Sequence, residues 1–153
     1  MKLGLDFDNT IVCYDRAFHA AAQERGWLEG EVTISKDAVK AHLHERQRND
    51  DWTELQGYVY GPGIVEAEPF PGLTNFLAAA NERNWKVWVV SHKTRHPYRG
   101  PQYDLHEAAR SWIESSGLLD DPTGLHRDRL FFETTKEAKL QRVRSLEVDA
   151  FID

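Results

Sequence analysis

The chain has 153 residues and a formal net charge of −6, with 41% hydrophobic and 11% aromatic residues. These values are ordinary for one globular domain, and the acidic balance argues against a nucleic-acid partner. A single cysteine, Cys13, excludes an intramolecular disulfide and a cysteine-rich zinc site. Because the sequence shows no leader-like segment and no long apolar run, we expect a soluble, cytoplasmic protein with no membrane partner.

The first half of the sequence predicts one strand and then a run of helices. The strand covers residues 2–6. Gly26 is placed to stop the first helix, Ser35 to cap the second, and Asp51 with Glu54 forms a capping-box pattern for the third. The predicted helices cover residues 15–25, residues 36 to about 47, and a short third segment that holds Trp52, Leu55 and Tyr58.

After residue 69, helical and strand patterns alternate. The predicted elements are a helix over 73–80, a strand over 85–90, a polar loop over 92–103, a helix over 104–116, a strand over 129–133, a helix over 135–146 and a strand over 148–152. Strands that alternate with helices form right-handed βαβ units. We therefore predict an α/β fold with a parallel sheet flanked by helices.

Asp6 and Asp8, in Asp6-Phe7-Asp8-Asn9-Thr10, are the most informative pair. A strand sends alternate side chains to one face, so these carboxylates project together from the strand's carboxyl end. Adjacent carboxylates repel, and a cation or a proton resolves the repulsion. A calcium loop fails because loop position twelve is Ala17. Phosphoryl transfer, with one Asp attacking phosphorus and the other moving protons, fits better than a solvated acidic turn.

Several segments that are distant in sequence converge on the same edge of the predicted sheet. Asp6, Ser91 and Asp153 each follow an apolar strand, and a lysine-bearing helix begins after a fourth strand. In open parallel sheets, ligands bind beyond the carboxyl ends of the strands. The sequence therefore predicts a ligand site at this edge.

The ordered motifs resemble the haloacid dehalogenase-like superfamily, in its phosphatase branch. Asp6-Phe7-Asp8-Asn9-Thr10 is similar to its first motif, and Val89-Val90-Ser91 to its second. Ala150-Phe151-Ile152-Asp153 resembles the opening of its fourth motif. The resemblance implies a Rossmann-like core formed by residues 1–13 and 69–153. It also implies a small helical cap of the C1 type, inserted after the first strand over 14–68.

The resemblance also implies roles for individual residues. Asp6 is expected to be the nucleophile, and Asp8 the acid and base that protonates the leaving oxygen and then deprotonates the attacking water. Mg²⁺ is the implied cofactor, with Asp6, Asp8 and Asp153 as its ligands. The implied phosphate-binding residues are Thr10, Ser91, His92 and Lys139.

Two lysines compete for the position of the third motif. Thr135-Lys136-Glu137-Ala138-Lys139-Leu140 resembles a segment of P-type ATPases, and that alignment favours Lys139 over Lys136. Relatives usually carry a second acidic residue after the position of Asp153, which this sequence does not contain.

We therefore predict a Mg²⁺-dependent phosphatase that acts on a small phosphorylated metabolite through an aspartyl-phosphate. One alternative is a nucleotidase or polynucleotide phosphatase, supported by the basic, tyrosine-containing loop over 92–103. That loop is equally well interpreted as a solvated segment. Another alternative is a non-catalytic phosphate-binding module, suggested by the missing second acidic residue after Asp153. The oligomeric state is left open.

Overall fold

The structure, a computed structural model, describes residues 1–153. Two compact units form. The first unit comprises Met1–Cys13, Pro69–Thr94 and Arg110–Asp153, and the second comprises Tyr14–Glu68 and Arg95–Ala109. Residues 95–109 group with Tyr14–Glu68 in this division, whereas the domain prediction placed them in the core.

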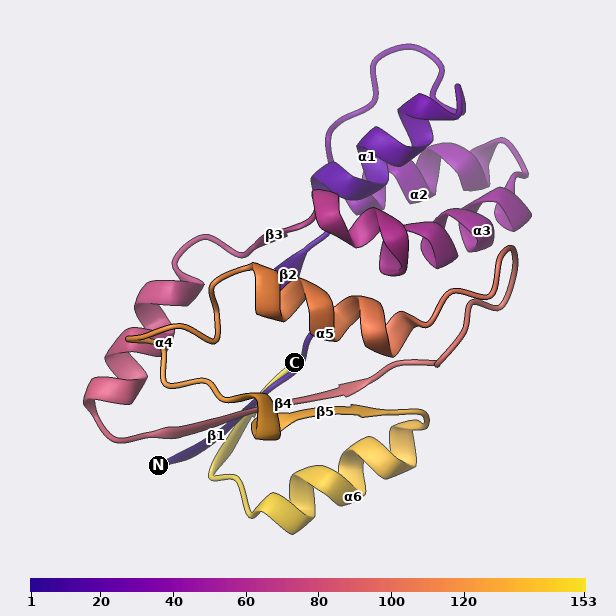
Figure 1. Cartoon of the computed structure of the whole chain (residues 1–153). Coiled ribbons are helices and arrows are strands. Elements are labelled where there is room, and N and C mark those ends of the chain that lie inside the picture. The colour runs from indigo at the N-terminus through magenta and orange to yellow at the C-terminus, as the bar shows by residue number, and fades with distance from the viewer. The chain divides into compact units, whose positions relative to one another are not determined.

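Six strands, six α-helices and two short 3-10 helices make up these units (Figure 1). In chain order they are β1 (Lys2–Leu5), β2 (Val12–Cys13), α1 (Asp15–Glu24), α2 (Lys36–Glu45), α3 (Asn49–Tyr60), η1 (Pro62–Glu66), β3 (Glu68–Pro69), α4 (Leu73–Glu82), β4 (Lys86–His92), α5 (Leu105–Ser115), η2 (Arg127–Arg129), β5 (Leu130–Glu133), α6 (Lys136–Leu146) and β6 (Ala150–Ile152). None of the helices combines the length and apolar character needed to span a bilayer.

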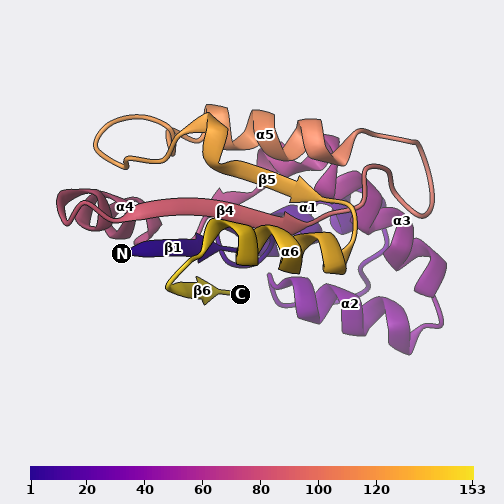
Figure 2. The same cartoon turned by 90° about the horizontal axis from the view of Figure 1, so that it is seen from below.

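The first unit is built on a four-stranded parallel sheet with the strand order β5-β4-β1-β6 (Figure 2). Leu5 of β1 lies beside Val89 of β4 on one side and Ile152 of β6 on the other. β2 and β3 pair in a separate two-stranded sheet. Because all four strands run the same way, their carboxyl ends share one edge. The prediction of an α/β fold with a parallel sheet flanked by helices is confirmed.

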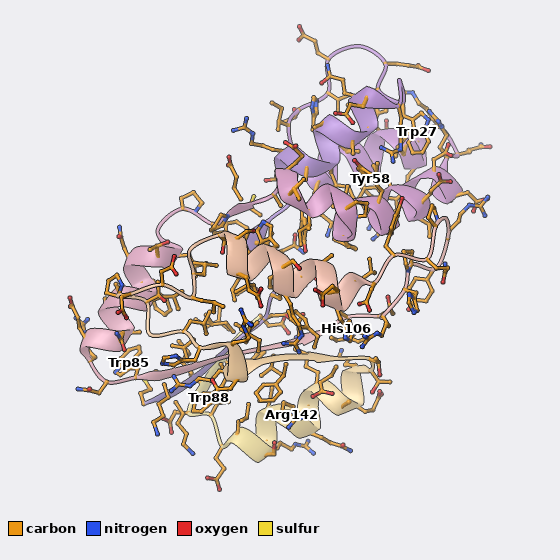
Figure 3. The ribbon with its side chains drawn as sticks, viewed as in Figure 1. Trp27, Tyr58, Trp85, Trp88, His106 and Arg142 are labelled. Atoms are coloured by element: carbon orange, nitrogen blue, oxygen red, sulfur yellow. The ribbon has the colours of Figure 1, made fainter.

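Alternate side chains of β5 show which helices cover the two faces of the sheet. Phe131 points to one face, where the guanidinium of Arg142 on α6 lies 4.4 Å from its ring centre (Figure 3). Phe132 points to the other face and meets Phe7 edge-on, with ring centres 5.3 Å apart. Trp112 of α5 meets the same Phe7 ring at 5.7 Å. This period of two is the geometry of a strand buried on both faces.

The second unit is a helical cluster with an aromatic core. Phe18 of α1 is fully buried and stacks on Trp52 of α3, with ring centres 4.9 Å apart. At the edge of this unit, the guanidinium of Arg25 lies 4.3 Å from the ring centre of Tyr58 and 5.5 Å from that of Trp27 (Figure 3). Aromatic side chains supply most of the apolar area that a small helical unit can bury.

The caps of the helices were predicted with mixed success. Ser35 caps α2 as expected, because its hydroxyl accepts a hydrogen bond of 3.2 Å from the backbone N–H of Ala38. The capping box at Asp51 is wrong, since α3 begins two residues earlier at Asn49. Asp51 lies in the first turn of the helix and accepts a hydrogen bond of 2.6 Å from Arg48 Nε. A carboxylate in the first turn interacts favourably with the helix dipole. The Asp51 carboxylate accepts its hydrogen bond from Arg48 instead of from the backbone N–H that a capping box would use.

Candidate active site

Asp6 and Asp8 lie in the turn that follows β1. The backbone N–H of Asp6 donates to the carbonyl of Ile152 at 2.8 Å, which continues the pairing of β1 with β6. Phe7 is fully buried between them and accepts backbone hydrogen bonds at its carbonyl from Ile11 and Val12. Because Phe7 points into the core, the two carboxylates project together on the opposite side of the chain. The turn is completed by an asparagine with positive φ, a conformation that asparagine tolerates.

The carboxylate of Asp6 is largely buried and receives several hydrogen bonds. Only 13% of its side chain is exposed, and Lys139 Nζ lies 2.9 Å from its Oδ2. The backbone N–H of Phe7 donates to Oδ1 at 2.7 Å, and the side chain of Ser91 also forms a hydrogen bond with this carboxylate. Burial raises the pKa of Asp6 above its ordinary value, although the hydrogen bonds from Ser91 and Lys139 oppose the rise.

Lys139 joins Asp6 to the carboxyl end of β6. Its Nζ lies 2.9 Å from Asp6 and 3.1 Å from Asp153, whose side chain is 66% exposed. Thr135 caps the start of α6 and so fixes the position of Lys139 one turn later. Burial alone would lower the pKa of Lys139, but hydrogen bonds to the two carboxylates raise it above its ordinary value. A hydrogen bond with Asp6 and another donated by Lys139 lower the pKa of Asp153.

Lys93 is a site residue that the sequence patterns did not predict. Its Nζ lies 3.0 Å from Oδ1 and 2.9 Å from Oδ2 of Asp8. The predicted strand ended near Ser91, so Lys93 was placed in a polar loop. In the structure β4 continues to His92, and the N–H of Lys93 donates to the carbonyl of Glu133 at 2.8 Å. A strand of that length places Lys93 on the same face as Ser91, which is the signal that could have identified it.

One cavity of about 520 Å³ collects most of the predicted site residues. Its lining includes the predicted residues Asp6, Asp8, His92, Lys139 and Asp153. Its apolar wall is formed by Leu140, Val143 and Phe151, and the alternative lysine, Lys136, is exposed at the same cavity.

Two of the predicted phosphate-binding residues, Ser91 and Thr10, do not line this cavity. Ser91 is almost fully buried and reaches the site through its hydrogen bond with Asp6. Thr10 lines a separate, mainly apolar cavity of about 280 Å³ together with Phe70 and Ile152. Thr10 lies in the turn after the strand rather than on the strand itself. The role of Thr10 in phosphate binding therefore stays a prediction, because Thr10 does not line the cavity that contains Asp6.

The oxygen donors at this cavity determine whether it fits Mg²⁺. No three acidic, histidine or cysteine side chains surround a common point. Lys139 lies between Asp6 and Asp153, and Lys93 lies against Asp8. Yet Mg²⁺ prefers hard oxygen ligands, needs only one or two carboxylates and keeps several waters. Asp6 and Asp153 with the backbone carbonyl of Asp8 offer a donor set of that chemistry.

Comparison with known proteins establishes a shared fold. No family model matches the sequence, and no curated protein matches it. The chain is similar to the structure of a haloacid dehalogenase-like family hydrolase from Streptococcus pneumoniae, with a TM-score of 0.59 and 16% identity, over 99% of this chain and 73% of that chain. A haloacid dehalogenase-like family hydrolase from Xanthomonas campestris matches with a TM-score of 0.47 and 14% identity, over 97% of this chain and 69% of that chain. The chain thus has the fold of the Streptococcus pneumoniae hydrolase.

Proposed function

We propose that this protein is a Mg²⁺-dependent hydrolase of phosphomonoesters that works through an aspartyl-phosphate on Asp6. The observation that supports it best is the pairing of two carboxylates, each with its own buried ammonium, at one cavity. Asp6 meets Lys139 at 2.9 Å, and Asp8 meets Lys93 at the same distance. A buried nucleophile beside a fixed cation suits attack on a phosphoryl group, because the cation balances the negative charge of both.

The proposed reaction has two steps. In the first, a carboxylate oxygen of Asp6 forms a bond to phosphorus while the bond from phosphorus to the leaving oxygen breaks. The leaving oxygen keeps the electron pair and takes a proton from Asp8. In the second, water attacks phosphorus and gives a proton back to Asp8, while the bond between phosphorus and Asp6 breaks. Inorganic phosphate leaves and the Asp6 carboxylate is restored.

The other residues of the cavity hold charge and geometry during these steps. Lys139 supplies a positive charge beside Asp6, and Ser91 orients the same carboxylate. When bound by Asp6, Asp153 and the carbonyl of Asp8, Mg²⁺ would neutralise charge on the phosphoryl oxygens. His92 and Lys136 lie at the exposed part of the cavity, where the ammonium of Lys136 would attract an anionic substrate.

The size and lining of the cavity support a small substrate. Its volume of about 520 Å³ lies in the range of pockets that hold metabolites. The apolar wall of Leu140, Val143 and Phe151 faces the non-phosphorylated part of such a molecule. We therefore propose a small phosphorylated metabolite as the substrate, with a nucleotide as the alternative within the same reaction class.

Phosphate release from a panel of compounds tests this function. The panel contains sugar phosphates, nucleoside monophosphates and a 5′-phosphorylated single-stranded DNA, each with Mg²⁺ and with a chelator. We expect Mg²⁺-dependent release that falls by at least about a thousandfold in Asp6→Asn. Asp128→Asn makes the same chemical change at an exposed position and should leave the rate unchanged. Full activity in Asp6→Asn would contradict the proposal, and calorimetric binding of phosphate without turnover would favour the non-catalytic module.

A further inference from the structure

Lys93 has no part in the two steps above, yet its ammonium lies against the group that moves the protons. Its Nζ is within 3.0 Å of both carboxylate oxygens of Asp8, and only 2% of its side chain is exposed. The same ammonium lies 5.6 Å from the ring centre of Phe7. A buried ammonium is costly unless it is paired and hydrogen-bonded, so this contact is a fixed part of the fold.

Neighbouring strands place Lys93 opposite Asp8 in a regular way. β1 and β4 run side by side in the sheet (Figure 2). Ser91 forms a hydrogen bond with Asp6. Two residues further along both segments, Lys93 forms a hydrogen bond with Asp8. Since side chains on one face of a strand repeat every second residue, the two contacts are successive steps of one pattern. The pairing of β1 with β4 therefore sets which side chain contacts each carboxylate.

The contact holds the Asp8 carboxylate on its buried side. Asp8 lies in a turn beyond the end of β1. It lines the cavity and keeps 22% of its side chain exposed, whereas Lys93 is almost completely covered. The ammonium therefore holds the carboxylate from the buried side and leaves it open toward the cavity.

We propose that Lys93 is a positioning residue for the proton transfers of Asp8, an inference that rests on the proposed phosphatase function. A general acid or base acts only within about 2.6–3.2 Å of the atom that exchanges the proton. A displacement of about 1 Å can cost roughly a hundredfold in rate. Lys93 keeps Asp8 at the cavity and acts on the reaction only through it.

Burst kinetics with p-nitrophenyl phosphate and Mg²⁺ separate the two steps. The p-nitrophenolate group leaves without a proton, so the first step needs little help from Asp8. The second step still needs Asp8 to accept a proton from water. For Lys93→Met we expect a burst of p-nitrophenol at a rate close to that of the wild type. We expect the steady rate after the burst to fall at least about tenfold, because a general base contributes on the order of a hundredfold or more.

A double-mutant cycle shows whether Lys93 acts through Asp8. Asp8→Asn should show the same pattern of a retained burst and a lower steady rate. Adding Lys93→Met to Asp8→Asn should cost less than about threefold more, because residues that act as a unit are not additive. Lys86→Met is the matched control, since Lys86 is exposed at the far end of β4, and both phases should match the wild type. Lys93→Arg retains the charge and should recover part of the steady rate.

Each result decides between the inference and its alternatives. A retained burst, a reduced steady rate and a non-additive double variant support positioning by Lys93. Equal loss of burst and steady rate, or effects that multiply in the double variant, would overturn it. If Lys93→Met does not fold, Lys93→Gln takes its place, because it also removes the ammonium, and a steady rate equal to that of the wild type in Lys93→Gln would overturn the inference. Wild-type protein without any turnover removes the proposed function itself, whereas an active wild type with a fully active Lys93→Met removes the inference alone.

Discussion

Replacing Lys139 by methionine is the most informative single perturbation of the site. The variant keeps the length of the side chain and removes the ammonium that lies 2.9 Å from Asp6 and 3.1 Å from Asp153. Asp6, already destabilised as an ion by burial, then loses its nearest positive charge. Both the stability of the fold and the attack on phosphorus should suffer.

The two contacts of Lys139 differ in weight. At 2.9 Å, with side chains that are 9% and 13% exposed, the attraction to Asp6 is about 5–6 kcal/mol at an effective dielectric constant of about 20, before the desolvation cost. Breaking a buried pair of this kind costs roughly 3–5 kcal/mol. Asp153 is 66% exposed, and exposed pairs contribute about 0–1 kcal/mol. The contact with Asp6 therefore accounts for most of the expected loss in the free energy of unfolding.

The assay is single-turnover hydrolysis of the best substrate, at a temperature well below the midpoint of thermal unfolding of the variant. We expect Lys139→Met to slow the first step by about 10²–10³-fold, as loss of one preorganised charge does in other enzymes. The unfolding midpoint should fall by about 6–20 °C for a chain of this size. Lys136→Met is the comparison, because it removes a lysine three residues earlier that is exposed. A greater loss in Lys136→Met than in Lys139→Met would refute this account of the site.

Two further predictions concern the helical unit and are measured by thermal and acid unfolding. The carboxylate of Asp104 accepts a hydrogen bond of 2.9 Å from the N–H of Glu107, and this bond lowers the pKa of Asp104, so Asp104→Ala should cost about 1 kcal/mol near neutral pH. That stability is present above the ordinary pKa of about 4 and is lost as the pH falls through the lowered pKa, so an undiminished difference between the proteins at low pH would contradict it. Gly57→Ala should lower the free energy of unfolding by about 1–3 kcal/mol, because a Cβ there would lie 2.7 Å from Cβ of Pro97 and 3.1 Å from the carbonyl oxygen of Arg99. A rise in stability, as expected for alanine in an open helix, would show that the segment over 95–109 does not pack against α3.

Much of the fold follows from local patterns in the sequence. The order of strands and helices was predicted because the hydrophobic period changes from 3.6 to 2 between segments, and the apolar run before Asp6 is short enough only for a strand. Gly26 and Gly117 both adopt positive φ just after the first and fifth helices, as a C-terminal glycine requires. These features depend on residues that are close in the chain, so one sequence is enough to show them.

Features that depend on distant contacts were not predictable in the same way. Residues 95–109 read as a polar loop followed by a helix, and contacts such as the close approach of Pro97 to Gly57 show that the segment packs with α3. Lys93 was assigned to that loop because the last residues of β4, which ends at His92, are polar and do not continue the apolar run of the strand. The pairing of Lys93 with Asp8 then depends on the order of β1 and β4 in the sheet, which a local pattern does not specify.

The central claim is that Asp6 itself receives the phosphoryl group. Acid quenching during turnover of p-nitrophenyl phosphate, followed by mass spectrometry of the N-terminal peptide, tests it most directly. We expect the mass of one phosphoryl group on Asp6 in Asp8→Asn, where hydrolysis by water is slowed. The same peptide should stay unmodified in Asp6→Asn and in protein quenched before substrate is added. Turnover by wild-type protein with an unmodified Asp6 in every variant would contradict the account.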